Sequence, residues 1–183
     1  IAYKNEIEPI IVITKTDMIT MKEKNEIKKY INYYRKLKIK IYVNTSVSKI
    51  KKEFASSVVA LCGQTGAGKS TLLNKIDASL SLKTGEVSTS LGRGKHTTRL
   101  VELLEVNDGL IADTPGFSSL ELNIPKKEIK KYYDDFNKPC KYRSCLHIKE
   151  EGCSIIDEVN KGKIPDWRYQ NYLKFMEETK EWK

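Results

Sequence analysis

The sequence predicts an α/β fold, a mostly parallel sheet with helices on both faces, followed by a small helical region. Short Ile- and Val-rich runs alternate with longer amphipathic stretches in the first part of the chain, as strands and crossover helices do. A glycine-rich loop at 63–70 joins one such run to a helical pattern. After Gly116 no strand-like run follows, and Pro, Cys, Tyr and His appear.

The individual helices and strands are predicted from local composition and from the spacing of apolar residues. The strand-like segments are 10–14, 39–44, 57–62, 99–106 and 109–113. The last two are joined by Asn-Asp-Gly, which is typical of a tight hairpin turn. The segments with a helical pattern are 21–37, 69–77, 125–136 and 165–181. The Gly-, Ser- and Thr-rich segment 77–98 has neither period and predicts a mobile loop.

Two domains are expected, one at 1–117 and a helical one at 118–183. No apolar run reaches the ~20 residues that cross a bilayer, and no signal-peptide pattern is visible. We therefore expect a cytoplasmic monomer without membrane contact. Of the net charge of +9, residues 22–40 carry eight Lys or Arg against two Glu. This segment is either a solvated helix face or a surface attracted to RNA phosphates.

A phosphate-binding loop is the strongest motif. It follows a strand-like run, opens a helical one and reads Gly63-Gln64-Thr65-Gly66-Ala67-Gly68-Lys69-Ser70, with Thr71 next. Its glycines let backbone N–H groups point at phosphate oxygens near a helix N-terminus. Lys69 is expected to reach the β- and γ-phosphates and Ser70 to bind Mg²⁺.

A second phosphate-side element is Asp113-Thr114-Pro115-Gly116, at the end of a strand-like run. Alone, these residues could form only a turn. Beside a phosphate-binding loop they predict a metal loop, in which Asp113 holds Mg²⁺ through water and the Gly116 N–H meets the γ-phosphate.

The purine-reading element comes first in the chain. Thr14-Lys15-Thr16-Asp17 follows a strand-like run and fits the loop with which GTPases read guanine. Asp17 would accept hydrogen bonds from guanine N1–H and its amino group, and the Lys15 stem would lie along the base. Thr14 replaces the commoner Asn, so its contact with the purine is an open question. Ser46, in Asn-Thr-Ser-Val after the next strand, is the second guanine-side residue.

This motif order, with the guanine loops before the phosphate loop, predicts a circularly permuted GTPase domain, since permutation preserves the contacts of a sheet. The ordered set "IEPIIVITKTDMI", "GQTGAGKSTLLNKI", "GRGKHTTR" and "IADTPGFSSLEL" with a following Cys/His cluster resembles the ribosome small-subunit-dependent GTPase A family (RsgA, also called YjeQ or YloQ). The resemblance covers essentially the whole chain.

Cys140, Cys145, His147 and Cys153 form the Cys/His cluster. Four such ligands suit a closed tetrahedral Zn²⁺ site, and the family carries one structural zinc here. The alternatives are disulfides, which an intracellular chain disfavours, or free thiols. Cys62 is expected to be a small core residue.

The catalytic group is inferred from the resemblance. A Ras-type enzyme orients water with a Gln after the metal-loop Gly, and here that residue is Phe117. The family's switch segment carries a His thought to assist hydrolysis, which corresponds to His96. Thr98, or Thr97 in its place, would bind Mg²⁺ when that loop closes, and Lys69 completes the expected catalytic set.

The resemblance implies a GTPase, EC class 3.6, that binds GTP and GDP with Mg²⁺ and acts in late maturation of the small (30S) ribosomal subunit. It also implies activation by the ribosome and contact with rRNA. Two interpretations compete with it: a P-loop ATPase or kinase in which Thr-Lys-Thr-Asp is coincidental, and a non-catalytic RNA-binding module.

The family's pattern is not complete in this sequence. The N-terminal OB domain of the family and the first strand of its GTPase domain have no counterpart before "IEPIIVITK". In a Ras-like sheet that strand lies between the phosphate-loop strand and the guanine-loop strand. We therefore expect the GTPase domain at 1–117 to be N-terminally incomplete, in which case segments 10–14 and 57–62 do not pair.

Overall fold

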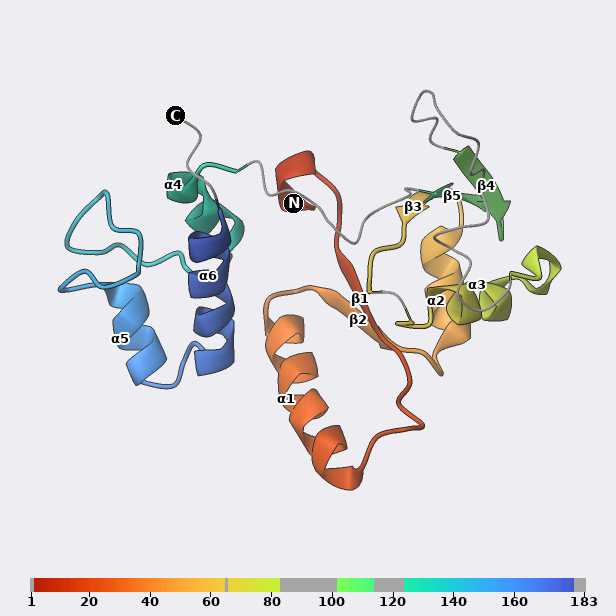
Figure 1. Cartoon of the computed structure of the whole chain (residues 1–183), viewed down its shortest axis with the longest axis horizontal. Helices are drawn as coiled ribbons and strands as arrows, with labels where there is room; N and C mark the ends of the chain where they lie inside the picture. Colours follow the sequence, from red (N-terminus) through yellow and green to blue (C-terminus); the bar gives the residue numbers. More distant parts are fainter. Residues whose placement is uncertain (1, 65, 83–101, 114–123, 180–183) are drawn as a thin grey trace. The chain divides into compact units, whose positions relative to one another are not determined.

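The computed structural model describes residues 2–64, 66–82, 102–113 and 124–179. The chain divides into two compact units (Figure 1). One unit is Pro9–Leu120, and the other combines Ile1–Glu8 with Glu121–Lys183. Among the described residues, no helix is both long and apolar enough to span a bilayer.

The first unit contains all five strands that the sequence predicts. They are β1 (Ile10–Ile13), β2 (Lys40–Val43), β3 (Val58–Ala60), β4 (Glu102–Val106) and β5 (Gly109–Asp113). Its helices are α1 (Met21–Lys36), α2 (Val47–Phe54) and α3 (Lys69–Ile76), with a 3₁₀ turn η2 at Ala78–Leu80. The predicted loop 77–98 begins with that turn, and its larger part lies outside the described residues.

The described strands form two sheets. β1 and β2 pair in parallel, while β3, β5 and β4 form a second sheet in that order. In the second sheet β3 is parallel to β5, and β4 is antiparallel to it. Among the described strands β1 and β3 are not neighbours, as expected from the sequence.

The parallel pairs decide where the loops meet. Ile13 pairs with Val43 in the first sheet, and Ala60 pairs with Ala112 in the second. Because the carboxyl ends of parallel neighbours reach the same edge, the loops after β1 and β2 leave together. The loops after β3 and β5 likewise leave the second sheet at one edge. Ligands of open α/β sheets bind outside the carboxyl ends of the strands, where such loops lie.

The predicted hairpin between β4 and β5 is confirmed. Asn107 and Asp108 both have positive φ, at 49° and 61°, which a two-residue turn of the mirror-image type requires. Gly109 follows, and a Cβ there would lie 1.8 Å from the carbonyl oxygen of Phe54. Only glycine fits this close approach of the backbone.

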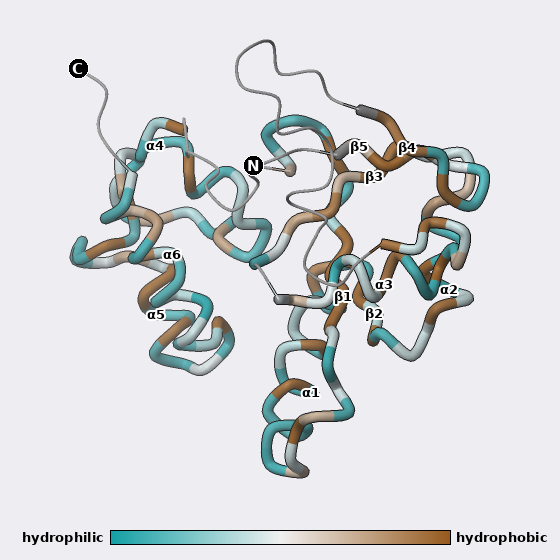
Figure 2. The backbone as a smooth tube through the Cα atoms, turned by 45° about the vertical axis from the view of Figure 1, so that its right-hand side comes forward, coloured by the Kyte–Doolittle hydropathy of each residue, from teal (hydrophilic) through white to brown (hydrophobic). Residues whose placement is uncertain are grey.

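The core of the first unit is formed by apolar faces of α2 and α3 with β4 and β5. Its buried members are Ile50, Phe54, Leu72, Leu73, Ile76, Val106 and Ile111, and the strands carry hydrophobic colours in Figure 2. Helix α2 was not predicted, although its apolar residues recur at helical spacing. The expectation for Cys62 is wrong: its side chain is exposed, two residues beyond the end of β3.

The second unit is helical. It contains α4 (Lys126–Ile129), α5 (Ser154–Asn160) and α6 (Asp166–Glu178), with 3₁₀ turns η1 at Tyr3–Asn5 and η4 at Lys130–Tyr132. The predicted helix 125–136 is wrong beyond its first turns, because α4 passes into η4 and the chain then turns toward Phe136. Helix α5 was not predicted.

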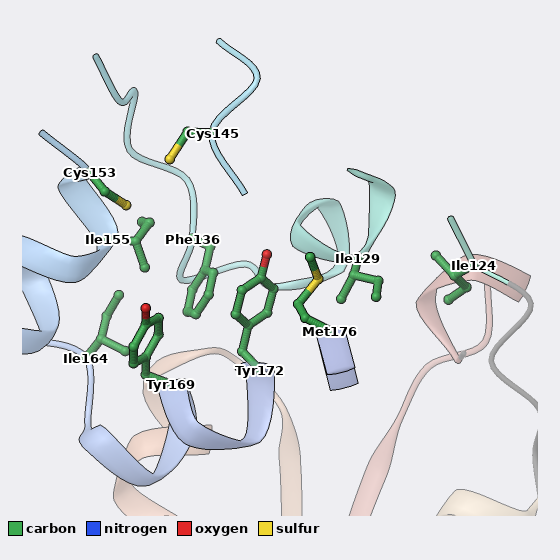
Figure 3. Close-up of a cluster of buried hydrophobic side chains, with 10 residues drawn as sticks. All are labelled: Ile124, Ile129, Phe136, Cys145, Cys153, Ile155, Ile164, Tyr169, Tyr172 and Met176. Carbon is green, nitrogen blue, oxygen red and sulfur yellow. The ribbon is translucent and has the colours of Figure 1, made fainter. Parts of the chain in front are cut away.

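Aromatic side chains lie among isoleucine, cysteine and methionine side chains in the core of this unit (Figure 3). Tyr172 is fully buried between Phe136 and Met176, and its ring centroid lies 4.8 Å from that of Phe136. Next to this core, Arg168 forms a 2.9 Å ion pair with Asp135 and lies 4.2 Å from the centre of the Tyr133 ring. Phe136 and Tyr172, with Tyr133 against them, are therefore packing residues of this unit.

Candidate nucleotide and metal sites

Three loops of the first unit converge through two side-chain hydroxyls. The Thr16 hydroxyl donates to Asn44 Oδ1 at 3.0 Å, which joins the loop after β1 to the loop after β2. The Thr14 hydroxyl donates to the carbonyl oxygen of Ala67 at 2.6 Å, inside the phosphate-binding loop. Segments fifty residues apart in the chain are thus held side by side.

Thr14 therefore has a definite role in this structure. Its side chain lies against Gly68 as well, where an added Cβ would be 3.7–3.9 Å from Thr14 atoms. Gly68 has φ of 93°, a conformation that favours glycine. The replacement of the commoner Asn by Thr thus leaves the guanine loop anchored to the phosphate loop. Asn44 is the first residue of the Asn-Thr-Ser-Val element and the last of the predicted strand 39–44, but the sequence does not predict it as a site residue.

The phosphate loop leads directly into helix α3. That helix begins at Lys69, so the N–H groups of its first turn lack helical partners and face the loop. The Lys69 ammonium donates to the carbonyl oxygens of Gly63 and Gln64 at 2.6 and 3.0 Å. Ser70 is buried and Thr71 is exposed. A nucleotide phosphate could replace these carbonyls as the partner of Lys69.

The remaining purine-side residues lie on the surface. Asp17 and Lys15 are exposed, and Lys15 adopts a positive φ of 56° that turns the loop after β1. Ser46 is half-buried, and its carbonyl accepts a hydrogen bond from Ile50 N at 3.1 Å in α2. Asp17 is thus open to a base held between the two loops.

The metal loop is described only at its start. Asp113 ends β5, next to the strand that leads into the phosphate loop. Four predicted site residues lie outside the described residues: Thr65, His96, Thr98 and Gly116.

The Cys/His cluster has the geometry of a metal site. The ligand atoms of Cys140, Cys145, His147 and Cys153 all lie within 4.8 Å of one another. His147 Nδ1 is 3.3–3.5 Å from each of the three sulfurs, and the sulfurs of Cys140 and Cys153 are 3.8 Å apart. A tetrahedral zinc ion with ordinary bond lengths sets sulfur–sulfur edges of about 3.8 Å and sulfur–nitrogen edges of about 3.6 Å. The cluster can therefore hold one metal ion.

Hydroxyl and carboxylate groups hold the loop that carries His147. Tyr169 donates to the His147 carbonyl at 2.8 Å, and Tyr172 donates to the Leu146 carbonyl at 2.6 Å. The Glu150 carboxylate accepts from the backbone N–H groups of residues 146, 148 and 149 at 2.6–3.0 Å. The sequence does not predict these three residues, because their partners are backbone atoms that no spacing pattern reveals.

Burial shifts the pKa values of three of the four ligands. Desolvation raises the pKa of the Cys145 thiol to about 12 and also raises the pKa of Cys153. Desolvation, with the nearby charge of Lys130, lowers the pKa of His147, which keeps the imidazole neutral as a ligand must be. A metal entering the cluster therefore displaces thiol protons.

Taken together, the first unit is a P-loop nucleotide-binding domain in which the purine-side loops precede the phosphate loop. A family model described as RsgA GTPase matches residues 1–123. The chain belongs to the RsgA GTPase family.

Curated relatives agree with this assignment. The small ribosomal subunit biogenesis GTPase RsgA of Geobacillus sp. (strain WCH70) is 45% identical over 96% of this chain and 63% of the relative. The protein of that name from Clostridium beijerinckii is 42% identical over 95% of this chain and 62% of the relative. The chain thus spans less than two thirds of the length of these relatives.

Solved structures give the same fold. YjeQ from Thermotoga maritima matches with a TM-score of 0.77 and 30% identity, over 97% of this chain and 62% of that one. YloQ, described as a circularly permuted GTPase, matches with a TM-score of 0.73 and 34% identity, over 94% of this chain and 57% of that one. The predicted permutation is therefore confirmed.

Proposed function

We propose that this chain binds GTP with Mg²⁺ and hydrolyses it to GDP during late maturation of the small (30S) ribosomal subunit. The observation that carries the proposal is the 2.6 Å bond from Thr14 to Ala67. That bond fixes the guanine loop beside the phosphate loop, so one nucleotide can contact both. Guanine selection by Asp17 follows, because its carboxylate accepts the two N–H donors that adenine does not present together.

The expected roles of the remaining residues follow from their positions. Lys69 leaves the carbonyls of Gly63 and Gln64 to bind the β- and γ-phosphates. Mg²⁺, when bound, stabilises the charge that develops on the phosphates. Ser70, Thr98 and Asp113 are its proposed ligands, and His96 is the proposed group that assists the attacking water. Gly116 and Thr65 complete the proposed phosphate contacts.

The ribosomal part of the proposal rests on the relatives, which are named small ribosomal subunit biogenesis GTPases. We propose the same partner for this chain, including contact with rRNA and activation of hydrolysis by the subunit. The proposed setting is the cytoplasm, and the proposed form is a monomer.

We further propose that the metal of the Cys/His cluster is a structural Zn²⁺. Three thiolates and one imidazole are a typical zinc ligand set, and the four-ligand site leaves no open position for catalysis. The donor distances fit a tetrahedral ion, as derived above. The unit around this cluster is small, so a metal adds stability that its core alone does not supply.

The test is GTP hydrolysis with and without purified small ribosomal subunits. Wild type should be stimulated by the subunits, and Lys69→Ala should lose the stimulated rate by about 100-fold or more, because the lysine stabilises transferring phosphate. Lys75→Ala is the matched control, since Lys75 is an exposed lysine of the same helix. Equal rates for wild type and Lys69→Ala, with or without subunits, would contradict the proposal.

A further inference from the structure

Helix α1 carries a cationic face that the nucleotide and metal sites do not use. Its six basic residues are exposed: Lys22, Lys24, Lys28, Lys29, Arg35 and Lys36. At 3.6 residues per turn these six fall within an arc of about 160° around the helix axis. Asn25 and Asn32 lie in the same arc, whereas both glutamates of the helix lie outside it. We name this arc, with its six cations and two asparagines, the basic face.

Local ion pairing does not neutralise the basic face. Within the part of the chain that the structure describes, none of its six cations takes part in an ion pair. Some lysines of the second unit are neutralised by ion pairs, although others, such as Lys126 and Lys127, form none among the described residues. Lys138 and Lys163 pair with Glu158, and Lys174 pairs with Glu178. The six cations of the basic face are therefore available to an anionic partner.

Helix stability explains only part of the basic face, namely Arg35 and Lys36 in the last turn, where the helix dipole favours cations. Lys22 and Lys24 lie in the first turn, where the positive end of the helix dipole disfavours cations. Lys24 and Lys28 are four residues apart, so they repel each other. The N-terminus of α1 is stabilised instead by a capping box, in which the Glu23 carboxylate accepts from Thr20 N at 2.7 Å.

The helix is held to its unit by its other side. Ile27, Ile31 and Tyr34 are half-buried, and they lie opposite the basic face. Figure 2 shows hydrophilic colours over much of α1 with separate hydrophobic bands. The basic face is thus presented to solvent on a rigid element about 21 Å long from Lys22 to Lys36.

We propose that the basic face of α1 binds the phosphate backbone of double-helical RNA. Lysine-rich surfaces bind phosphates as point charges without reading bases, and the length of the face covers several phosphates. Single strands are bound through aromatic side chains that stack on bases, and the basic face contains no aromatic residue. This inference deepens the proposed function, on which it rests for the identity of the RNA as ribosomal.

The test measures binding of the full 183-residue chain to a 20-base-pair RNA duplex by fluorescence anisotropy between 50 and 200 mM salt. The variant Lys24→Gln/Lys28→Gln/Arg35→Gln removes three charges from one row of the basic face. We expect at least about tenfold weaker binding at 100 mM salt. The slope of log binding constant against log salt concentration should be smaller by about 2 to 3, because each lost phosphate contact lowers that slope by nearly one.

The matched control is Lys49→Gln/Lys52→Gln/Lys75→Gln. It removes the same charge from exposed positions of α2 and α3 in the same unit, and should weaken binding less than threefold. An equal loss in both variants, or no loss in the α1 variant, would overturn the proposal. The proposal would also be overturned if wild type bound a 20-nucleotide oligo(U) more tightly than the duplex and the α1 variant lost that binding. Circular dichroism should show both variants folded.

The two proposals fail separately. Lys69→Ala should bind the duplex like wild type, because Lys69 lies outside the basic face. Loss of duplex binding in the α1 variant, together with no stimulation of wild type by small subunits, would support the surface and contradict the ribosomal function. The opposite pattern is also distinguishable. If the α1 variant binds the duplex like wild type, and small subunits stimulate it to the wild-type rate at the same subunit concentration, the basic face is contradicted and the ribosomal function is supported.

Discussion

The metal site and the nucleotide site differ in how far apart their parts lie in the sequence. Four metal ligands come from residues 140–153 and meet within 4.8 Å, on loops held by hydroxyls from α6. The nucleotide loops come from residues near 14, 44 and 67 and from two separate sheets, joined by two threonine hydroxyls. A local site draws its geometry from its own few residues, whereas a distributed site depends on contacts between distant segments.

Removal of the metal should have the largest effect and should act on one region only. Cys153→Ala, or chelation of the metal, should abolish the cooperative unfolding of residues 124–179, because structural zinc contributes on the order of 10 kcal/mol. Hydrogen exchange of the α5 and α6 amides measures this loss. Cys62→Ala is the control, since that thiol is exposed and lies in the other unit. Unchanged protection of α5 and α6 in Cys153→Ala would contradict the assignment.

The hydroxyl that holds the metal loop should have an intermediate effect. Tyr172→Phe keeps the buried ring but removes the 2.6 Å bond to the Leu146 carbonyl, so we expect a loss of about 1–2 kcal/mol. Urea unfolding of the second unit measures it. Tyr142→Phe, at an exposed tyrosine of the same loop region, should change stability by less than about 0.5 kcal/mol. Equal losses in both variants would show that the loop is not held by Tyr172.

The bond between the nucleotide loops should have the smallest effect of the three. Thr14→Val removes the donor to Ala67 and keeps the shape of the side chain, so we expect nucleotide affinity to fall roughly fivefold, equivalent to about 1 kcal/mol. Thr14→Ser keeps the hydroxyl and should bind within about twofold of wild type. Titration with a fluorescent GDP measures both. If Thr14→Ser loses as much as Thr14→Val, packing of the Thr14 methyl group, and not the hydrogen bond, joins the loops.

The sequence predicts the strands and the motifs better than it predicts the short helices. Each strand is an apolar run between turn residues, and the hairpin at Asn107-Asp108 has its own turn chemistry. Helices α2 and α5 have only 8 and 7 residues, so their apolar residues recur over too few turns to predict a helix, whereas the equally short α3 is marked by the phosphate loop before it. In segment 125–136 local propensity favours one helix, but burial of Ile129 and Phe136 in the same core requires the chain to turn between them.

For the candidate sites, the sequence predicts the groups that are proposed to meet a ligand, but it does not predict the groups that position them. Ligand-contacting residues are set by chemistry that repeats in motifs, such as four metal donors or a lysine after a glycine loop. Tyr172, Glu150 and Asn44 act on backbone or side-chain atoms that become neighbours only in the folded chain. The exposure of Cys62 has the same origin, because β3 ends before that residue is reached.

The most direct test of the account is the nucleotide preference of Asp17→Asn. Wild type should bind GTP at least about 100-fold more tightly than XTP, because the carboxylate pairs with two N–H donors of guanine and repels the C2 carbonyl of xanthine. In Asp17→Asn the amide can donate to that carbonyl, so the preference should reverse toward XTP while total binding persists. Such a gain cannot arise from misfolding. An unchanged preference, or equal binding of ATP and GTP by wild type, would contradict the assignment of the loop after β1 as the reader of guanine.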